Sequence, residues 1–275
     1  ITLIIYVIVT YWTGKGVCQF TFLDVGQGDS TLISTPSGKH YLIDTGPAPK
    51  SNYYNPAKTV IIPYLKHHLI GTLEAIFITH FDSDHTGGLA TIIKHIKVGS
   101  IIHHGVPQWT PEITQLIAQH RITEIIVKAD DKIILDPTVT CRILHPATHH
   151  NFKTSKNENS LSFLITHNQI DALFTGDLGQ HHENTLAQYY RHQIECDILQ
   201  VGHHGSQTSS SSFFLQTTRP TDAIISVGKY SRYGHPHQKV ITRLKQVKST
   251  IHRTDTKGTI NIISNGSTYN ISYSK

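Results

Sequence analysis

The sequence contains no methionine and has only three cysteines and two tryptophans in 275 residues. The cysteines Cys18, Cys141 and Cys196 lie far apart in apolar, strand-like stretches and form no CxxC pair. An odd number of separated cysteines gives no support for a disulfide-built fold, so we expect buried free thiols that serve packing. Because the chain begins at Ile1 without a methionine, we expect a processed product or a segment of a longer chain.

Long hydrophobic runs are also scarce, and the only strongly apolar, uncharged stretch of note is Ile1–Trp12. A helix that crosses a membrane needs about 20 such residues, and a signal peptide needs a basic start and a small-residue cleavage site. We therefore expect residues 1–16 to be the end of a membrane helix, with a first β-strand as the alternative. Residues 17–275 are then predicted to form one domain.

Charge is only weakly biased, with 24 Lys and Arg against 19 Asp and Glu. This net charge of +5 is a poor argument for a nucleic-acid partner. The 21 histidines are more unusual. Histidine is the commonest metal ligand, so the places where these residues cluster are the informative feature.

Short apolar runs separated by Gly, Pro, Asn and Asp predict many strands with interspersed helices. Strands are predicted at 17–25, 29–35, 40–46, 74–79, 100–103, 124–127, 139–144, 160–166, 169–177, 196–202, 222–228, 257–264 and 267–273. Helices are predicted at 56–68, 86–96, 181–190 and 238–247. This order favours an α/β (α+β) architecture of two sheets packed face to face and covered by helices. The polar stretch 148–159 is predicted to be a loop between the two halves.

The strongest chemical signal is ITHFDSDHTGG, residues 78–88. Four potential metal ligands, His80, Asp82, Asp84 and His85, fall within six residues where a strand meets a helix. Alternate residues of an extended segment share a side, so His80, Asp82 and Asp84 can converge on one metal ion. His85, at the turn, can then face a second ion beside the first. Such a concentration of polar groups is costly unless it binds something. The pattern predicts a metal site.

Other polar residues stand at predicted strand ends that are followed by glycine, where α/β scaffolds display functional groups. They are Asp24 in LDVGQGDS, Asp177 in FTGD, and the pair His203 and His204 in VGHHGS. Asp177 suits a carboxylate that bridges two metals, and His203 or His204 suits closure of the second site. Each residue alone is also compatible with an ordinary turn or cap.

Together these motifs resemble the metallo-β-lactamase superfamily and, more narrowly, the C-terminal hydrolase domain of the ComEC family of DNA-uptake channel proteins. The matching segments, which run in family order, are LDVGQGDS (23–30), IDTG (43–46), THFDSDHTGG (79–88), NENSLSFLI (157–165), TGD (175–177), GHHGS (202–206) and YGHPH (233–237). The resemblance implies a four-layer αββα sandwich with a two-metal site at one edge. It also implies attachment to a multi-pass protein of the bacterial inner membrane, with DNA, the parent channel domain and other uptake proteins as partners.

By position, the resemblance assigns the metal ligands to His80, Asp82, Asp84, His85, Asp177 and His203. Supporting or substrate-facing roles fall to Asp24, Asn159, His204, Ser206 and Arg232, and catalytic roles fall to Asp84 and His235. The superfamily pattern has a histidine where this chain has Asp82, and its third-motif histidine is missing near Asn159. Fewer imidazoles favour Mn²⁺ or Mg²⁺ as the two divalent ions, with Zn²⁺ still possible.

These residues predict hydrolysis of DNA phosphodiesters, with the ions activating a water and His235 giving a proton to the leaving oxygen. The aromatic and basic run KYSRYGHPH (229–237) could hold bases and phosphates. Two alternatives remain at this stage. The same fold hydrolyses small esters, lactones and thioesters, and a degenerate metal site would leave a non-catalytic DNA-binding module.

Overall fold

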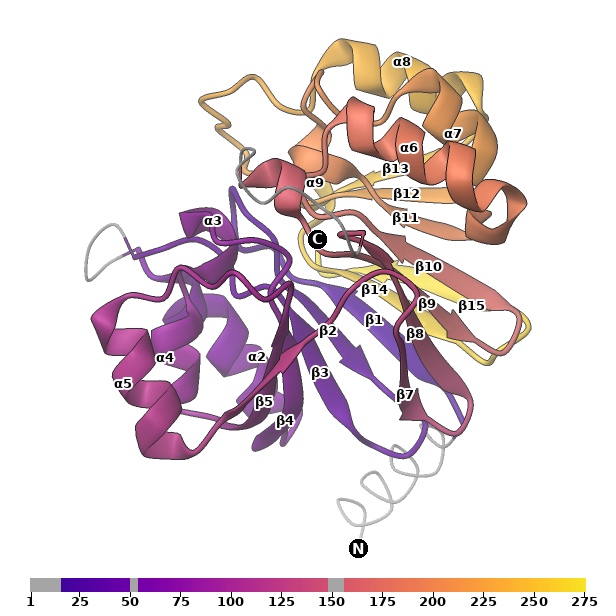
Figure 1. Cartoon of the computed structure of the whole chain (residues 1–275). Coiled ribbons are helices and arrows are strands. Elements are labelled where there is room, and N and C mark those ends of the chain that lie inside the picture. The colour runs from indigo at the N-terminus through magenta and orange to yellow at the C-terminus, as the bar shows by residue number, and fades with distance from the viewer. Residues whose placement is uncertain (1–15, 50–53, 148–155) are drawn as a thin grey trace, which may run out of the picture.

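Two β-sheets packed face to face form the centre of the computed structural model, which describes residues 16–49, 54–147 and 156–275 (Figure 1). The first sheet has eight strands in the order β15-β14-β1-β2-β3-β4-β5-β6. The second has seven strands in the order β13-β12-β11-β10-β9-β8-β7. Helices cover the outer face of each sheet, which gives the four-layer αββα sandwich that the sequence predicts.

Each sheet is built mainly from one half of the chain. The strands of the first sheet are β1 (Cys18–Phe22), β2 (Thr31–Ser34), β3 (His40–Ile43), β4 (Thr72–Phe77), β5 (Lys97–His103), β6 (Thr123–Ile126), β14 (Ile260–Ser264) and β15 (Tyr269–Tyr273). Those of the second are β7 (Lys132–Asp136), β8 (Val139–His145), β9 (Ser162–His167), β10 (Ile170–Phe174), β11 (Ile198–Gln200), β12 (Asp222–Ile225) and β13 (Thr250–Arg253).

The helices fall into two groups, one on each side of the sandwich (Figure 1). On the first sheet lie the π-helical turn η1 (Ala57–Ile61), α2 (Ile62–His67), α3 (Ser83–Thr86), α4 (Leu89–Ile93) and α5 (Pro111–His120). The second sheet carries α6 (Gln180–Tyr190), η3 (Arg191–Ile194), α7 (Ser212–Thr218) and α8 (Gln238–Gln246). Short helical turns also occur at η2 (Asn157–Asn159), η4 (Gly202–Gly205) and α9 (Thr254–Lys257).

Three buried apolar clusters separate the four layers. The cluster between the sheets contains Phe20 and Phe22 of β1 together with Phe163 and Phe174 from the facing sheet. In β4, Ile76 faces the helices of the first sheet, whereas its neighbours Ala75 and Phe77 enter the cluster between the sheets. In β11, Leu199 faces the helices of the second sheet, whereas Ile198 enters the cluster between the sheets. Alternate residues of a strand thus enter different layers, as the two-residue period of a strand requires.

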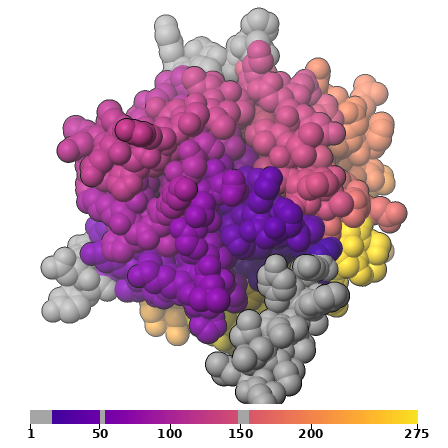
Figure 2. Space-filling view, turned by 90° about the horizontal axis from the view of Figure 1, so that it is seen from below, coloured from indigo at the N-terminus to yellow at the C-terminus, as the bar shows by residue number. Residues whose placement is uncertain are grey.

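The C-terminal segment crosses from the second sheet back to the first. β14 pairs antiparallel with β1, with Cys18 opposite Ser264. This pairing places the two ends of the domain side by side and completes the eight-stranded sheet. Seen from below, atoms of the first half cover the left and centre of the molecule, and those of the second half lie along the right (Figure 2).

Most predicted elements occur within a few residues of their expected bounds. The exceptions are α5, α7, β7, β13 and the short helical turns α3, α9, η2, η3 and η4, none of which is predicted from the sequence. All three cysteines are buried free thiols, as expected. The predicted membrane stub at 1–16 lies, except for residue 16, outside the described residues, as does most of the loop at 148–159. Among the residues that are described, no helix combines the length and apolar character needed to span a membrane.

Candidate metal centre

The candidate site lies where β4 of the first sheet and the neighbouring strands β10 and β11 of the second sheet end. β4 leads into His80 and Asp82, β10 leads into Asp177, and β11 leads into His203 and His204. β10 and β11 run parallel, and their carboxyl ends therefore present the following loops at one edge of the sheet. The architecture thus brings together residues that are about 120 positions apart in the sequence.

Glycines let the backbone segments of the site approach one another. Gly28 has φ of +139°, and a Cβ there would lie 2.4 Å from the carbonyl oxygen of Asp84. At Gly87, a Cβ would lie 1.9 Å from the backbone nitrogen of Ala48. The QGDS and HTGG segments therefore need glycine because the loops around the site pass too closely for a side chain.

Asp177 is the central residue of the site. Its Oδ1 lies 3.3 Å from Nε2 of His85. Its Oδ2 lies 3.9 Å from Nε2 of His80, 3.7 Å from that of His203 and 3.8 Å from that of His204. Only 4% of the Asp177 side chain is exposed. One buried carboxylate thus faces four imidazoles from two loops.

Four buried side chains form what we call the inner cluster: Asp29, His85, Asp177 and His204. One donor atom of each lies within 4.8 Å of the others. Several buried atoms here make no hydrogen bond within the described part of the chain, namely Asp29 Oδ1, His80 Nε2, His85 Nε2, Asp177 Oδ1 and His204 Nε2. Unsatisfied buried polar atoms are costly, and converging nitrogen and oxygen donors suit a divalent transition-metal ion. The residues present therefore fit the metal that the sequence predicts.

Asp44 and Thr79 orient the histidines of the first loop. Nδ1 of His85 donates to Oδ2 of Asp44 at 2.7 Å, which turns Nε2 toward Asp177. The Thr79 hydroxyl donates to the same Asp44 oxygen at 2.6 Å and lies 3.1 Å from Nδ1 of His80. A carboxylate behind a histidine is the usual support of a metal-binding imidazole.

His204 is oriented from the second sheet in a similar way. Its Nδ1 donates to the backbone oxygen of Ser226 at 3.0 Å, and its Nε2 lies 3.3 Å from Oδ2 of Asp84. Asp29 Oδ2 accepts a hydrogen bond from Gln200 Nε2 at 2.6 Å. Both groups of the inner cluster are thereby fixed before any ion binds.

Asp82 and His203 form a more open outer group. Their side chains are 35% and 28% exposed. Lys156 Nζ lies 3.3 Å from Oδ1 of Asp82, and Asn157 Nδ2 lies 3.3 Å from Nε2 of His203. Both partners come from the segment around η2, near the place where the superfamily pattern has its third-motif histidine. The outer group is therefore already engaged by protein side chains.

Buried charges of both signs shift the pKa values in the inner cluster. Burial lowers the pKa of His204, but Asp177 and Asp29 outweigh burial and raise it to about 9. For His85, Asp177 and Asp44 likewise outweigh burial and hold the pKa well above its ordinary value. Burial raises the pKa of Asp29 to about 6. In the metal-free protein, protons on the histidines thus balance the carboxylates, and these are the protons that a metal ion would displace.

The pKa values of His80 and Asp84 are lowered, in contrast to the raised values of His85, His204 and Asp29. Burial and the charge of His85 hold the pKa of His80 well below its usual range. Burial would raise the pKa of Asp84, but the His204 imidazole 3.3 Å away and the charge of His85 lower it to about 2. A neutral imidazole and an ionised carboxylate are the forms that bind metals.

His235 lies at the rim of the site rather than in the inner cluster. Its ring centroid is 5.7 Å from that of His203 and 5.6 Å from that of Tyr233. Burial, together with the charges of His203 and His204, lowers the pKa of His235 to about 4. In the metal-free protein the ring is therefore neutral at neutral pH.

The remaining predicted residues lie around the site or away from it. Ser206 is buried and bonds with Thr208, and Asn159 is buried beside Ser160, whose hydroxyl accepts from the backbone N–H of Asp177. Arg232 is exposed. Asp24 accepts from Lys275 Nζ at 2.7 Å, so the carboxylate that supports a histidine is Asp44 instead.

Sequence reasoning misses Asp29 and Asp44 and gives His204 only a supporting role. Asp29 and Asp44 stand in the quoted motifs LDVGQGDS and IDTG, so the signal is present in the sequence. Adjacent His203 and His204 both adopt left-handed backbone conformations, with φ of 52° and 53°. This turn places His204 in the inner cluster and leaves His203 at its edge.

The family profile described as the Metallo-beta-lactamase superfamily matches residues 23–229. Among characterised sequences, the chain is 31% identical over 258 residues to ComE operon protein 3 of Bacillus subtilis, covering 88% of this chain and 32% of that protein. It is 34% identical over 249 residues to Recombination protein 2 of Haemophilus influenzae, covering 90% and 29%. The chain thus spans about a third of the length of these relatives.

Solved structures of other proteins have the same fold as this chain. The metallo-beta-lactamase fold protein YhfI from Bacillus subtilis matches with a TM-score of 0.59 at 12% identity, covering 90% of this chain and 99% of that one. CmlA, a diiron beta-hydroxylase from Streptomyces venezuelae, matches with a TM-score of 0.57 at 12% identity, covering 86% and 52%. The matched profile and the sequence relatives show that the chain belongs to the metallo-β-lactamase superfamily and is a homologue of the ComEC-family proteins.

Proposed function

We propose that this chain is the metal-dependent phosphodiester hydrolase domain of a longer DNA-uptake protein in a bacterial inner membrane. The observation that carries the proposal is the inner cluster, in which two carboxylates and two imidazoles converge around Asp177. The sequence relatives, one of which is named Competence protein ComA, support a role in DNA uptake. They also support a parent protein about three times as long as this chain.

His85, Asp177 and His204 of the inner cluster would hold one divalent ion, with Asp29 or Asp84 completing the set. His80, Asp82 and His203 would hold a second, with Asp177 shared between the two. When bound, the ions supply activation of a water molecule and charge neutralisation at the phosphate. The mixture of nitrogen and oxygen donors favours Mn²⁺, with Mg²⁺ and Zn²⁺ as alternatives.

The protein itself contributes orientation, desolvation and a surface for the strand. Asp44 and Ser226 hold His85 and His204 in place through their Nδ1 atoms. Outside the inner cluster, the loop 229–237 carries Tyr230 and Tyr233, which are 85% and 72% exposed, with Lys229 and Arg232 beside them. Exposed tyrosines can stack on unpaired bases, and the cations can contact phosphates. Tyr233 connects this surface to the site through its ring contact with His235.

The decisive experiment incubates the full chain with labelled single-stranded and double-stranded DNA in EDTA, Mn²⁺, Mg²⁺ or Zn²⁺. We expect metal-dependent cleavage that is abolished in Asp84→Ala and unchanged in Asp24→Asn, whose carboxylate meets Lys275 away from the inner cluster. Cleavage of small esters or lactones without cleavage of DNA would instead identify a different hydrolase. DNA binding that survives Asp84→Ala, with no turnover at any metal, would identify a binding module.

A further inference from the structure

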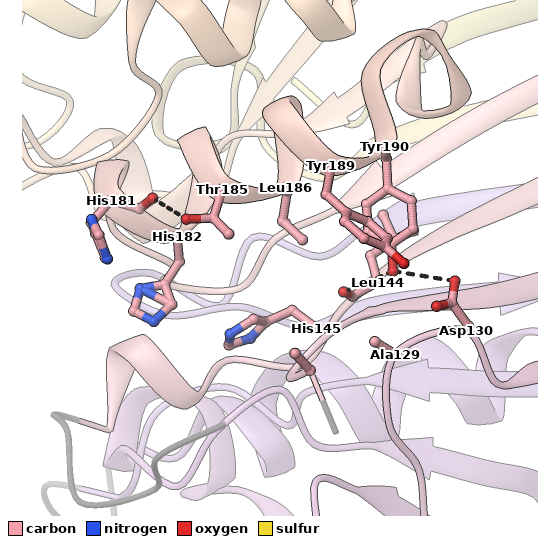
Figure 3. Close-up of a pocket in the computed structure, with 11 residues that line it drawn as sticks. Ala129, Asp130, Leu144, His145, His181, His182, Thr185, Leu186, Tyr189 and Tyr190 are labelled. Carbon is pink, nitrogen blue, oxygen red and sulfur yellow. Dashed lines mark hydrogen bonds between the residues drawn. The ribbon is translucent and has the colours of Figure 1, made fainter. Parts of the chain in front are cut away.

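A pocket of about 520 Å³ runs along helix α6 (Figure 3), and none of the described residues that line it belongs to the metal centre. One wall is the helix itself, which contributes His182, Leu186 and Tyr189. The opposite wall is the end of β8, with Leu144 and His145. The volume lies within the range of roughly 300–1,000 Å³ that is common for small-molecule sites.

The two ends of this pocket differ in chemistry. At one end, the rings of His145 and His182 stand almost perpendicular, with centroids 5.2 Å apart. At the other end, Asp130 accepts from Arg142 at 2.9 Å and from the Tyr190 hydroxyl at 3.3 Å. Both of these bonds go to Oδ1, and among the described residues no hydrogen bond goes to Oδ2 of this side chain, which is 52% exposed. Between the ends the walls are Leu144, Leu186 and the ring of Tyr189 (Figure 3).

The histidine end lies next to the metal centre. Nδ1 of His145 donates to the backbone oxygen of Ser160 at 2.9 Å. The hydroxyl of the same Ser160 accepts from the backbone N–H of Asp177 at 3.1 Å. Asp177 also precedes the start of α6 by only three residues. A ligand that extends from the pocket past His145 would therefore emerge beside the inner cluster.

We propose that this pocket binds a nucleobase that carries an exocyclic amino group, from the nucleotide next to the phosphate at the metal centre. Within the described part of the chain, the pocket is lined by neither Lys nor Arg, and the nearby guanidinium of Arg142 is already paired with Asp130. Aliphatic and aromatic walls suit a flat ring, and the Asp130 carboxylate suits an amino donor. Adenine, cytosine and guanine carry such a group, and thymine does not. This inference rests on the proposed function, since it takes a polynucleotide as the substrate.

The first test measures binding of dAMP, dCMP and dTMP to the EDTA-treated full chain by calorimetry, where no ion contributes and no hydrolysis occurs. We expect dAMP and dCMP to bind about tenfold more tightly than dTMP, because they carry an exocyclic amino group that can donate to Asp130, whereas thymine offers only its ring N3–H. Asp130→Ala, which removes the acceptor, should remove most of this preference. Equal binding of the three nucleotides, or a preference that survives Asp130→Ala, would overturn the proposal.

A second test blocks the pocket from its rim. Thr185 is exposed and lines the pocket, so Thr185→Trp fills it without disturbing the core. Gln188→Trp, on the same helix but outside the lining of this pocket, is the matched control. We expect Thr185→Trp to weaken dAMP binding at least tenfold and Gln188→Trp to leave it unchanged, with unfolding temperatures verifying that both variants fold. An equal effect of both variants would contradict the proposal.

The two proposals can fail separately. Metal-dependent DNA cleavage without nucleotide binding, and with the same rate in Thr185→Trp, would leave the hydrolase standing and remove the pocket. Nucleotide binding that is sensitive to Thr185→Trp, in a chain that cleaves no DNA with any metal, would retain the pocket and remove the hydrolase.

Discussion

The inner cluster and the outer group are parts of one site, yet they meet their surroundings differently. The inner cluster is buried, and its donor atoms point at one another without hydrogen-bond partners among the described residues. The side chains of the outer group are about a third exposed, and Lys156 and Asn157 already contact them. Binding an ion stabilises buried ligand atoms that lack hydrogen-bond partners the most. Ligand atoms that are solvated and already paired are stabilised the least.

From this contrast we expect the inner cluster and the outer group to bind ions with unequal affinity. The inner cluster should bind first and tightly, and the outer group should bind second. The missing third-motif histidine falls on the outer side, where the segment around η2 supplies a lysine and an amide instead. The predictions below use the difference, from the largest expected effect to the smallest.

Asp177→Asn should have the largest effect, because Asp177 faces imidazoles of both halves. We expect loss of Mn²⁺ binding at both sites by more than about 100-fold, beyond the roughly 10–100-fold cost of losing a supporting partner. Calorimetric titration with Mn²⁺ measures this directly. Asp24→Asn should bind like the unchanged chain. Retention of one tight ion in Asp177→Asn would show that Asp177 is not shared.

Asp44→Asn should weaken the inner site alone. The carboxylate fixes Nδ1 of His85 and accepts from Thr79, so the amide would leave the imidazole less well oriented and less basic. We expect about 10–100-fold weaker binding of the first ion and little change for the second. Equal weakening of both steps in the same titration would argue against an independent inner cluster.

Metal affinity should also rise with pH. The pKa of His204 is about 9 in the metal-free protein, so its proton must leave when an ion binds. Release of the His204 proton alone predicts about tenfold tighter binding per pH unit between pH 7 and 9, and release of the His85 proton adds to this slope. Titrations in buffers of different ionisation enthalpy would count the protons released, and a pH-independent affinity would contradict the prediction.

The same shift has a consequence for stability. Because the folded-state pKa of His204 exceeds its ordinary value of 6.5, its protonation stabilises the metal-free fold fully below about pH 6.5. That contribution is lost as the pH rises through about 9. We expect the unfolding temperature of the EDTA-treated chain to fall across this window and that of the metal-loaded chain to fall less.

Lys156→Ala should have the smallest effect and the opposite sign. Removing the ammonium 3.3 Å from Asp82 frees that carboxylate and removes a competing positive charge. We expect binding of the second ion to become a few-fold tighter, since exposed ion pairs contribute only about 0.2–1 kcal/mol. Lys229→Ala removes a lysine from the loop 229–237 and is the matched control. Weaker second-ion binding in Lys156→Ala would show that the lysine supports the site.

Local patterns in the sequence predict much of the fold, and they fail where a strand or helix depends on distant partners. β1 alternates apolar and polar residues, β10 ends in an apolar run, and both are predicted near their true bounds. β7 and β13 are edge strands whose pairing with β8 and β12 decides their conformation. The helix α5 carries a Thr110 cap and a proline at its start, which are signals that the sequence analysis could have used.

The sequence by itself determined the chemistry of this protein: the HxDxDH turn, the carboxylate after β10, the histidine pair and the glycines that allow close approach. Only the tertiary structure decided which of those groups share a site. In the folded structure Asp29 joins the inner cluster and Asp44 supports His85, whereas Asp24 pairs with Lys275. Local spacing in the sequence does not encode these contacts, because they form between loops of two different sheets. The tertiary structure also separated His203 from His204, since two left-handed residues in a row direct adjacent side chains to different surroundings.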